Sequence, residues 1–169
     1  VAEALKGRKI PLIVDPVLSS SSGTKLGDNR NAAYLKELFP LAWCITPNIP
    51  EAVELTGRKI ASVGDMKKAC AELMAGGCKA VLLTGGHLEH DEIADVFYDG
   101  NEFVLHRHPK VETNNLHGTG CVLSAAIAAN LAKGFPVKTA VRHAIQFLQS
   151  AIENSRYAKM GKGNGPVLQ

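Results

Sequence analysis

The sequence predicts a single α/β domain, in which a largely parallel sheet carries helices on both faces and includes a β-hairpin. Short apolar runs at residues 10–14, 43–46 and 79–83 have the length and composition of buried parallel strands. Segments with helical periodicity separate these runs, as in a doubly wound sheet. Two further apolar runs, 93–98 and 102–106, flank an Asp-Gly pair, which is a strong hairpin signal and makes the sheet mixed.

Length and composition suit one domain over residues 1–169, since 46% of the residues are hydrophobic, 21% are charged, and no internal repeat or linker interrupts the chain. Residues 1–9 read as a helix with no capping residue ahead of it, so we expect an amino-terminal part of the fold to be missing. Residues 19–27 form a Ser- and Gly-rich loop that either closes over a site or only connects two elements, and residues 161–169 are also predicted as a loop. Helices are predicted at residues 31–39, where Pro40 ends the helix, and at 48–55, 62–76, 121–132 and 137–152.

The most informative stretch surrounds Gly118 and Gly120, which precede an apolar helix that begins near Thr119. The first turn of a helix offers backbone N–H donors and the positive end of the helix dipole, which together favour a bound anion such as phosphate. The same field would favour a thiolate at Cys121, which could then act as a base or a nucleophile. The alternative is an ordinary helix cap with a buried cysteine.

Polar residues follow the other predicted strands, where the carboxyl ends of parallel strands meet and ligands bind. Asp15, the pair Asn48 and Glu51, and the pair Thr84 and Gly86 lie at these positions. Carboxylates near a phosphate-binding helix start would hold Mg²⁺, a hard cation that prefers oxygen ligands and usually keeps several waters. Each of these residues also has a structural interpretation, as a helix cap or as a turn residue.

Several other functions are excluded by the sequence. The net charge of +3 is spread along the chain with no basic run interleaved with aromatics, so nucleic acid is not an expected partner. The four cysteines have neither metal-ligand nor disulfide spacing, which predicts reduced thiols and a cytoplasmic protein. The chain has no apolar stretch of about 18 residues, so no membrane span is predicted.

The known nucleotide-binding motifs are also missing. No P-loop is present, and Leu123 stands where the dinucleotide-binding pattern needs its third glycine. Among the histidines only His117, next to the glycines, is a candidate for ligand contact.

A family resemblance emerges from several motifs taken together. In their order, the motifs resemble the hydroxymethylpyrimidine and phosphomethylpyrimidine kinases of thiamine biosynthesis, in the ribokinase-like superfamily, over the later part of such a kinase. In that family a glycine-rich opening segment supplies much of the pyrimidine pocket, and nothing here matches it. The motifs are VDPV at 14–17, TPNIPEA at 46–52, GGH at 85–87, NNLHGTGC at 114–121 and GNGPV at 163–167.

The resemblance implies ATP-dependent phosphorylation of a hydroxymethyl group or of an existing phosphate. Gly118, Thr119 and Gly120 would form the anion hole for the transferred phosphoryl group. Cys121 would take the place of the catalytic aspartate found in most of the superfamily. The acceptor would be a small pyrimidine alcohol or its phosphate, with no nucleic acid or membrane partner.

The resemblance also assigns the nucleotide and metal contacts. Asp15, Asn48 and Glu51 would organise Mg²⁺ and the phosphates through water, and Thr84 and Gly86 would lie along the triphosphate of ATP. The pyrimidine kinases of the family often have lysine at the position of Thr84, so this chain lacks a positive charge there.

Two alternatives stay open, besides a purely structural α/β module. The acceptor could be pyridoxal or a related vitamin B6 alcohol, because related kinases share these motifs. The chain could also be a nucleotide-binding fragment that is inactive without the missing amino-terminal portion. A sheet cut at one edge exposes strand hydrogen-bonding groups, which predicts a homo-oligomer or pairing with that portion.

Overall fold

The sheet is mixed, and only three of its strands are parallel. The computed structural model describes residues 1–18, 33–86, 92–159, 163 and 165–168. Within them one five-stranded sheet has the order β1-β2-β3-β4-β5. The first three strands pair in parallel, and the last two continue the sheet as an antiparallel hairpin. The strands are β1 (Ile13–Val14), β2 (Cys44–Ile45), β3 (Val81–Leu83), β4 (Glu92–Tyr98) and β5 (Phe103–Pro109).

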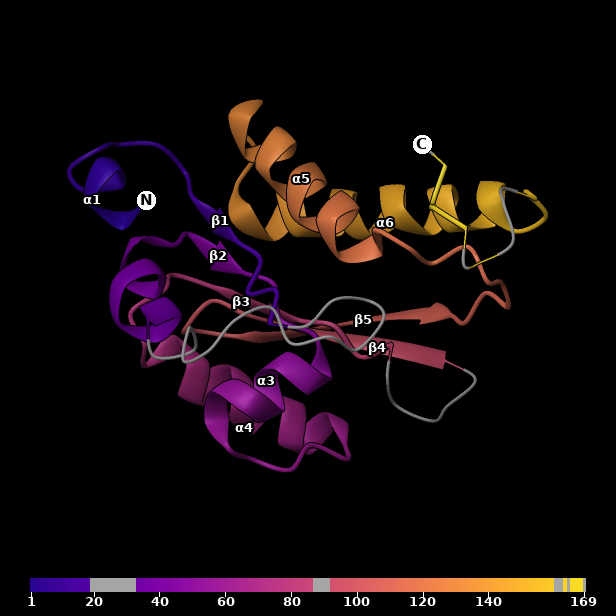
Figure 1. The fold of residues 1–169 in the computed structure, drawn as a ribbon. Coiled ribbons are helices and arrows are strands. Elements are labelled where there is room, and N and C mark those ends of the chain that lie inside the picture. Colours follow the sequence, from indigo (N-terminus) through magenta and orange to yellow (C-terminus); the bar gives the residue numbers. More distant parts are fainter. Residues whose placement is uncertain (19–32, 87–91, 160–162, 164, 169) are drawn as a thin grey trace.

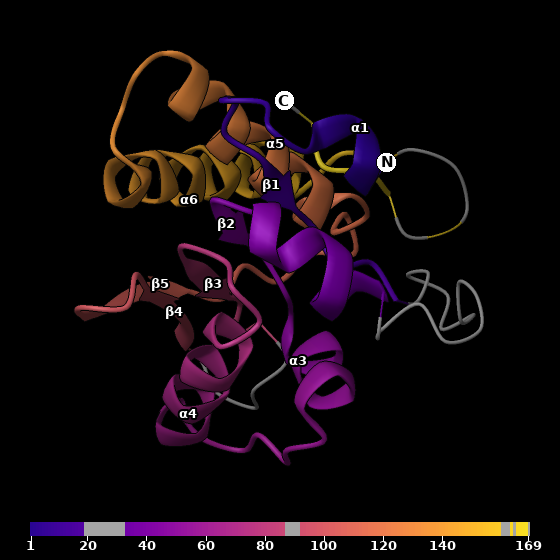
Figure 2. The same cartoon turned by 90° about the vertical axis from the view of Figure 1, so that its left-hand side faces the viewer.

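Helices cover both faces of this sheet. Helices α3 (Ile49–Thr56) and α4 (Val63–Met74) lie on one face, whereas α5 (Thr119–Ala132) and α6 (Val137–Ser155) lie on the other (Figures 1 and 2). Because successive side chains of a strand point to opposite faces, Leu82 packs with α5 and α6 while its neighbours in β3 pack toward α3 and α4. The sheet therefore separates two apolar cores, as the predicted architecture requires.

The predicted helix boundaries are confirmed where capping residues mark them. Asn48 caps α3, and Gly57 ends it in the left-handed conformation with φ 67°. The Ser62 side chain caps α4 by accepting a hydrogen bond from the Asp65 N–H. Gly118, with φ 87°, precedes α5, which begins at Thr119 as expected.

Two predicted helices have different forms. The helix expected over 31–39 is a π-helix η1 (Tyr34–Leu38) that runs into a 3₁₀-helix η2 (Phe39–Leu41) in the part that the structure describes. Pro40 does not end it, because proline is accommodated in the first turn of a helical segment, where its missing N–H costs no hydrogen bond. The helix expected over residues 1–9 is only α1 (Ala2–Leu5), followed by Gly7 at φ 74°.

Other predictions differ at element ends or lie outside the described residues. Strand β1 has two residues instead of the five expected, and β5 continues to Pro109. The predicted loop at 19–27 and His87 of the GGH motif lie outside the described residues. Among the helices that can be described, none is long and apolar enough to cross a membrane.

Candidate functional site

The start of α5, residues 118–121, has the geometry of the predicted anion-binding turn. Gly118 adopts φ 87°, and the first hydrogen bond of the helix runs from the Val122 N–H to the Gly118 carbonyl over 2.9 Å. The Thr119 N–H donates to the Leu116 carbonyl over 3.4 Å, whereas the N–H groups of Gly120 and Cys121 precede the first intrahelical bond and have no intrahelical acceptor, so these two are available to a ligand. Cys121 lies in this turn and is exposed, in contrast to the three other cysteines, which are buried. The alternative of a buried Cys121 is therefore wrong.

Asp15 lies beside this turn, as the sequence predicted. A Cβ atom on Gly120 would lie 3.7 Å from Asp15 Oδ2. Burial raises the pKa of Asp15, although hydrogen bonds from the side chains of Thr46 and Ser124 partly oppose the rise. The hydroxyl of Thr46 donates to Asp15 Oδ1 over 3.4 Å. The end of β1 and the start of α5 therefore place a partly desolvated carboxyl group next to the anion-binding turn.

Asn48 and Glu51 form a reciprocal cap at the start of α3. The Asn48 N–H donates to Glu51 Oε2, and the Glu51 N–H donates to Asn48 Oδ1, each over 2.9 Å. Their structural interpretation as a helix cap is thus confirmed, and it accounts for one oxygen of each side chain. Asn48 also pairs with Thr84 in an isolated parallel bridge, and the Thr84 N–H donates to the Pro47 carbonyl over 3.0 Å. The ends of β2 and β3 therefore meet at this cap.

Glu51 carries the largest carboxyl shift of the site. Its pKa is raised from 4.5 to about 7, chiefly by burial; the negative charge of Asp15 also raises it, while hydrogen bonds with the backbone and side chain of Asn48 and the backbone of Leu18 oppose the rise. The carboxyl groups of Asp15 and Glu51 are thus close enough for the charge of one to affect the pKa of the other. Within the described ranges, no group of three or more Asp, Glu, His or Cys side chains is placed so that it could hold a metal ion. A cation here would need water or ligand oxygens in addition to these carboxylates, which is the usual coordination of Mg²⁺.

The pKa of Glu51 predicts how stability depends on pH. The folded protein keeps this proton up to about pH 7, whereas the unfolded chain releases it near pH 4.5, so stability falls as pH rises through this window. In a metal-free buffer, the free energy of unfolding of Glu51→Gln relative to that of the original chain is expected to rise by up to about 3 kcal/mol between pH 5 and pH 8. Urea unfolding at several pH values measures the difference. Glutamine keeps an oxygen for the Asn48 N–H, and an equal difference at all pH values would contradict the shift.

Gly85 and Asp95 hold the backbone beside the candidate site through a contact that the sequence reasoning missed. The Gly85 N–H donates to Asp95 Oδ1 over 2.9 Å, and the other carboxylate oxygen lies 3.1 Å from His108 Nε2. A Cβ on Gly85 would overlap the Ala94 carbonyl oxygen, whereas one on Gly86 would meet only Ile93 Cδ1 at 4.0 Å. The signal in the sequence was the single charged residue inside the apolar run 93–98. Asp95 thereby fixes the turn that follows Thr84.

His117 lies at the entrance to the anion-binding turn. Its backbone forms an isolated parallel bridge with Pro166, near the C-terminal end of the chain. Its side chain is exposed. The predicted loop at 161–169 therefore contains an ordered contact with the site, and ligand contact by His117 stays a prediction.

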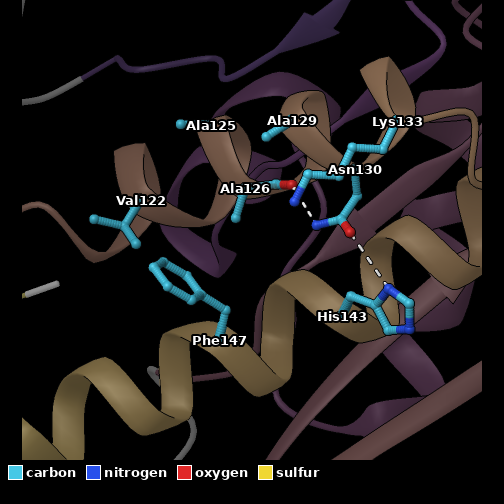
Figure 3. A pocket seen from close by; sticks show the side chains of 8 residues that line it. All are labelled: Val122, Ala125, Ala126, Ala129, Asn130, Lys133, His143 and Phe147. Atoms are coloured by element: carbon cyan, nitrogen blue, oxygen red, sulfur yellow. Dashed lines mark hydrogen bonds between the residues drawn. The ribbon is translucent and has the colours of Figure 1, made fainter.

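A separate hollow of about 500 Å³ lies along the outside of α5 and α6 (Figure 3). His143 Nδ1 lies 3.3 Å from Asn130 Oδ1, and Phe147 faces the small side chains of α5. No predicted site residue lines this hollow, so it is distinct from the anion-binding turn. Its lining consists of Val122, Ala125, Ala126, Ala129, Asn130, Lys133, His143 and Phe147.

Comparison with known proteins agrees with this geometry. The family model for phosphomethylpyrimidine kinase matches residues 1–168. A hydroxymethylpyrimidine/phosphomethylpyrimidine kinase of Rhizobium meliloti is 43% identical over 169 residues, which is 99% of this chain and 64% of that protein. The thiamine biosynthesis bifunctional protein ThiED of Geobacter sulfurreducens is 40% identical over 98% of this chain and 34% of its own length.

A solved structure extends the likeness to the fold. The pyridoxal kinase of Staphylococcus aureus in complex with ADP superposes with a TM-score of 0.85 and 37% identity, over 93% of this chain and 57% of that one. The ribokinase-like fold is thereby confirmed, and this chain spans less than two thirds of the length of these relatives. The chain belongs to the phosphomethylpyrimidine kinase family.

Proposed function

We propose that the chain carries the phosphoryl-transfer part of an ATP-dependent kinase that phosphorylates hydroxymethylpyrimidine, its monophosphate, or both, in thiamine biosynthesis. The observation that carries this proposal is the meeting of the α5 N-terminus, the exposed Cys121 and the half-buried carboxyl of Asp15. Phosphoryl transfer needs mainly positioning and stabilisation of negative charge, and the N–H donors of Gly120 and Cys121 at the start of a helix supply both. Membership of the family supports the pyrimidine acceptor.

The proposed roles follow the site from the phosphate outward. The backbone of residues 118–120 stabilises the charge on the transferred phosphoryl group, and Cys121 accepts the proton of the attacking hydroxyl. The hydroxyl oxygen bonds to the terminal phosphorus, the bond from phosphorus to the bridging oxygen breaks, and ADP leaves. Thr84 and Gly86 lie along the triphosphate, while Asn48 and His117 contact the nucleotide.

Mg²⁺ fits the carboxyl pair that the structure brings together. Burial raises the pKa values of Asp15 and Glu51, and the charge of Asp15 also raises that of Glu51, so a cation between them would favour the charged form of both carboxyl groups. We propose that these two carboxylates hold Mg²⁺, mainly through water. When bound, the ion would neutralise charge on the phosphates.

A second acceptor is favoured by one specific observation. The pyridoxal kinase of Staphylococcus aureus shares the fold at 37% identity, so vitamin B6 alcohols are the alternative substrates. The third possibility is a nucleotide-binding fragment that does not turn over alone. We further propose a cytoplasmic location, since all four cysteines are described and none forms a disulfide. We also propose that the chain associates, through the open edge of β1, into a homo-oligomer or with a missing portion.

Calorimetry with ATP and Mg²⁺, followed by an ADP-release assay, tests the proposal. We expect ATP to bind, and turnover to be faster with the pyrimidine alcohol or its phosphate than with pyridoxal. Gly120→Ala places a methyl group between the turn and Asp15, and it should weaken ATP binding about tenfold, equivalent to about 1.4 kcal/mol.

Phe147→Ala is the matched control, because it alters the hollow along the outside of α5 and α6, which no predicted site residue lines. If ATP binding were weakened in Phe147→Ala and not in Gly120→Ala, the nucleotide would be assigned to the hollow instead of to the turn. Preference for pyridoxal would select the second acceptor. ATP binding without turnover on any acceptor would select the inactive fragment, and absence of ATP binding would refute the proposal.

A further inference from the structure

The side chain of Asn115 connects the segment before α5 to the end of α6. Asn115 is buried, and its amide donates to the carbonyls of Ser155 and Ala158 over 2.6 and 2.8 Å. Both acceptors lie at or just beyond the C-terminal end of α6. The backbone three residues ahead of Gly118 is therefore tied to the C-terminal end of α6.

The last described residues of the chain, 165–168, lie along the same segment, and we call them the C-terminal strap. The His117 N–H donates to the Gly165 carbonyl over 3.2 Å, and the Val167 N–H donates to the His117 carbonyl over 3.1 Å. The Leu168 N–H donates to Ser155 Oγ over 2.6 Å. Figure 1 shows this C-terminal end next to the end of α6.

Packing holds the strap against the protein. Val167 is buried in a small apolar cluster with Ala151 and Ile152 of α6. Gly165 lies so close to Asn115 that a Cβ would overlap Asn115 Oδ1 and would approach Asn115 Cγ to 2.8 Å. A side chain at position 165 would therefore displace the side chain of Asn115, the residue that anchors the turn.

We propose that the C-terminal strap is a positioning device for the anion-binding turn, in which Asn115 and Ser155 act as positioning residues for phosphoryl transfer. This inference rests on the proposed function for its catalytic consequence. Backbone donors stabilise a developing charge only when their direction is fixed before reaction. His117, held on both its N–H and its carbonyl by the strap, is the residue directly ahead of Gly118. The strap thereby sets the direction from which the chain enters the turn.

The first experiment compares Gly165→Ala with Gly163→Ala, whose added Cβ would meet nothing within 4 Å. Hydrogen exchange followed by mass spectrometry reports on residues 114–122 without requiring any activity. We expect exchange in this peptide to rise by about tenfold in Gly165→Ala and to stay unchanged in Gly163→Ala. Unchanged exchange in both variants would overturn the proposal.

A milder pair of variants keeps the test valid if Gly165→Ala does not fold. Ser155→Ala removes the acceptor of the Leu168 N–H, and Ser150→Ala removes a serine with the same bond to the carbonyl four residues earlier on α6. Exchange in 114–122 should rise only in Ser155→Ala. An equal rise in both variants would point to a general loosening of α6 and would overturn the role of the strap.

Kinetics test the catalytic consequence separately. With turnover established for the original chain, Gly165→Ala and Ser155→Ala should lower kcat by about tenfold to a hundredfold, with KM for ATP changed less than about twofold. A rise in KM for ATP with unchanged kcat would overturn the positioning role. If the original chain shows no turnover, the proposed function fails, and the exchange experiment still decides whether the strap orders the turn.

Discussion

Replacement of Cys121 by alanine is expected to lower kcat by about 10²-fold to 10⁴-fold, the usual contribution of a positioned general base. ATP affinity should stay nearly intact, because the backbone donors of the turn and the Asp15–Glu51 pair are untouched. Cys121 is exposed in the first turn of α5, where the helix dipole and the N–H donors favour a negative charge. Steady-state kinetics and calorimetry with ATP measure the two quantities on the same preparations.

A chemical readout tests the same assignment without turnover. Iodoacetamide at neutral pH should alkylate Cys121 first, because Cys44, Cys70 and Cys78 are buried and burial raises the pKa of each of those thiols. ATP should protect Cys121 from the reagent, since the nucleotide phosphates would cover the turn. Unchanged kcat in Cys121→Ala, or alkylation at an equal rate with and without saturating ATP, would remove Cys121 from the reaction.

Replacement of Gly85 by alanine is expected to cost about 3 kcal/mol of stability or more, at the upper end for point substitutions. The new Cβ would overlap the carbonyl oxygen of Ala94 in the neighbouring strand, and relief of that overlap would pull the Gly85 N–H away from Asp95. The strand-to-turn junction after Thr84 would shift with it. For a chain of this size the melting temperature should fall by about 6 to 12 °C.

Gly86→Ala provides the stability control for this change, because its Cβ would meet only the end of Ile93 at van der Waals distance. Its melting temperature should stay within about 2 °C of the original value. Equal melting temperatures for the two variants would show that the turn after β3 can relax away from Ala94. Calorimetric scans of both proteins in one buffer decide the matter.

Local patterns in the sequence were sufficient for much of the fold. The cap at Ser62 and the apolar stripe that begins at Met66 predicted α4, and the Asp-Gly pair after Tyr98 predicted the β4–β5 hairpin. These signals work because each is contained within one or two helical turns or one tight turn. The π-helix at Tyr34–Leu38 was missed, since no local pattern distinguishes it from an α-helix.

The site was predictable to the extent that strand ends converge. Asp15 was expected beside Gly120, and the structure brings the two together. The hydroxyls that hydrogen-bond to Asp15, those of Thr46 and Ser124, were missed because they come from different elements whose faces only the assembled sheet defines. The C-terminal strap was missed for the same reason, because a Gly-rich tail has no periodicity from which the segment that it contacts could be predicted.

The mixed sheet determines the order in which this site can form. The β4–β5 hairpin and the α5–α6 pair join segments adjacent in sequence, whereas Val14 reaches Ile45 only across a long closure of the chain. Local contacts form fast, and closure entropy delays distant ones. The contacts that complete the site, Asn115 with Ser155 and Gly120 with Asp15, are both non-local, so phosphate binding at the turn would depend on the whole assembled fold and not on the start of α5 alone.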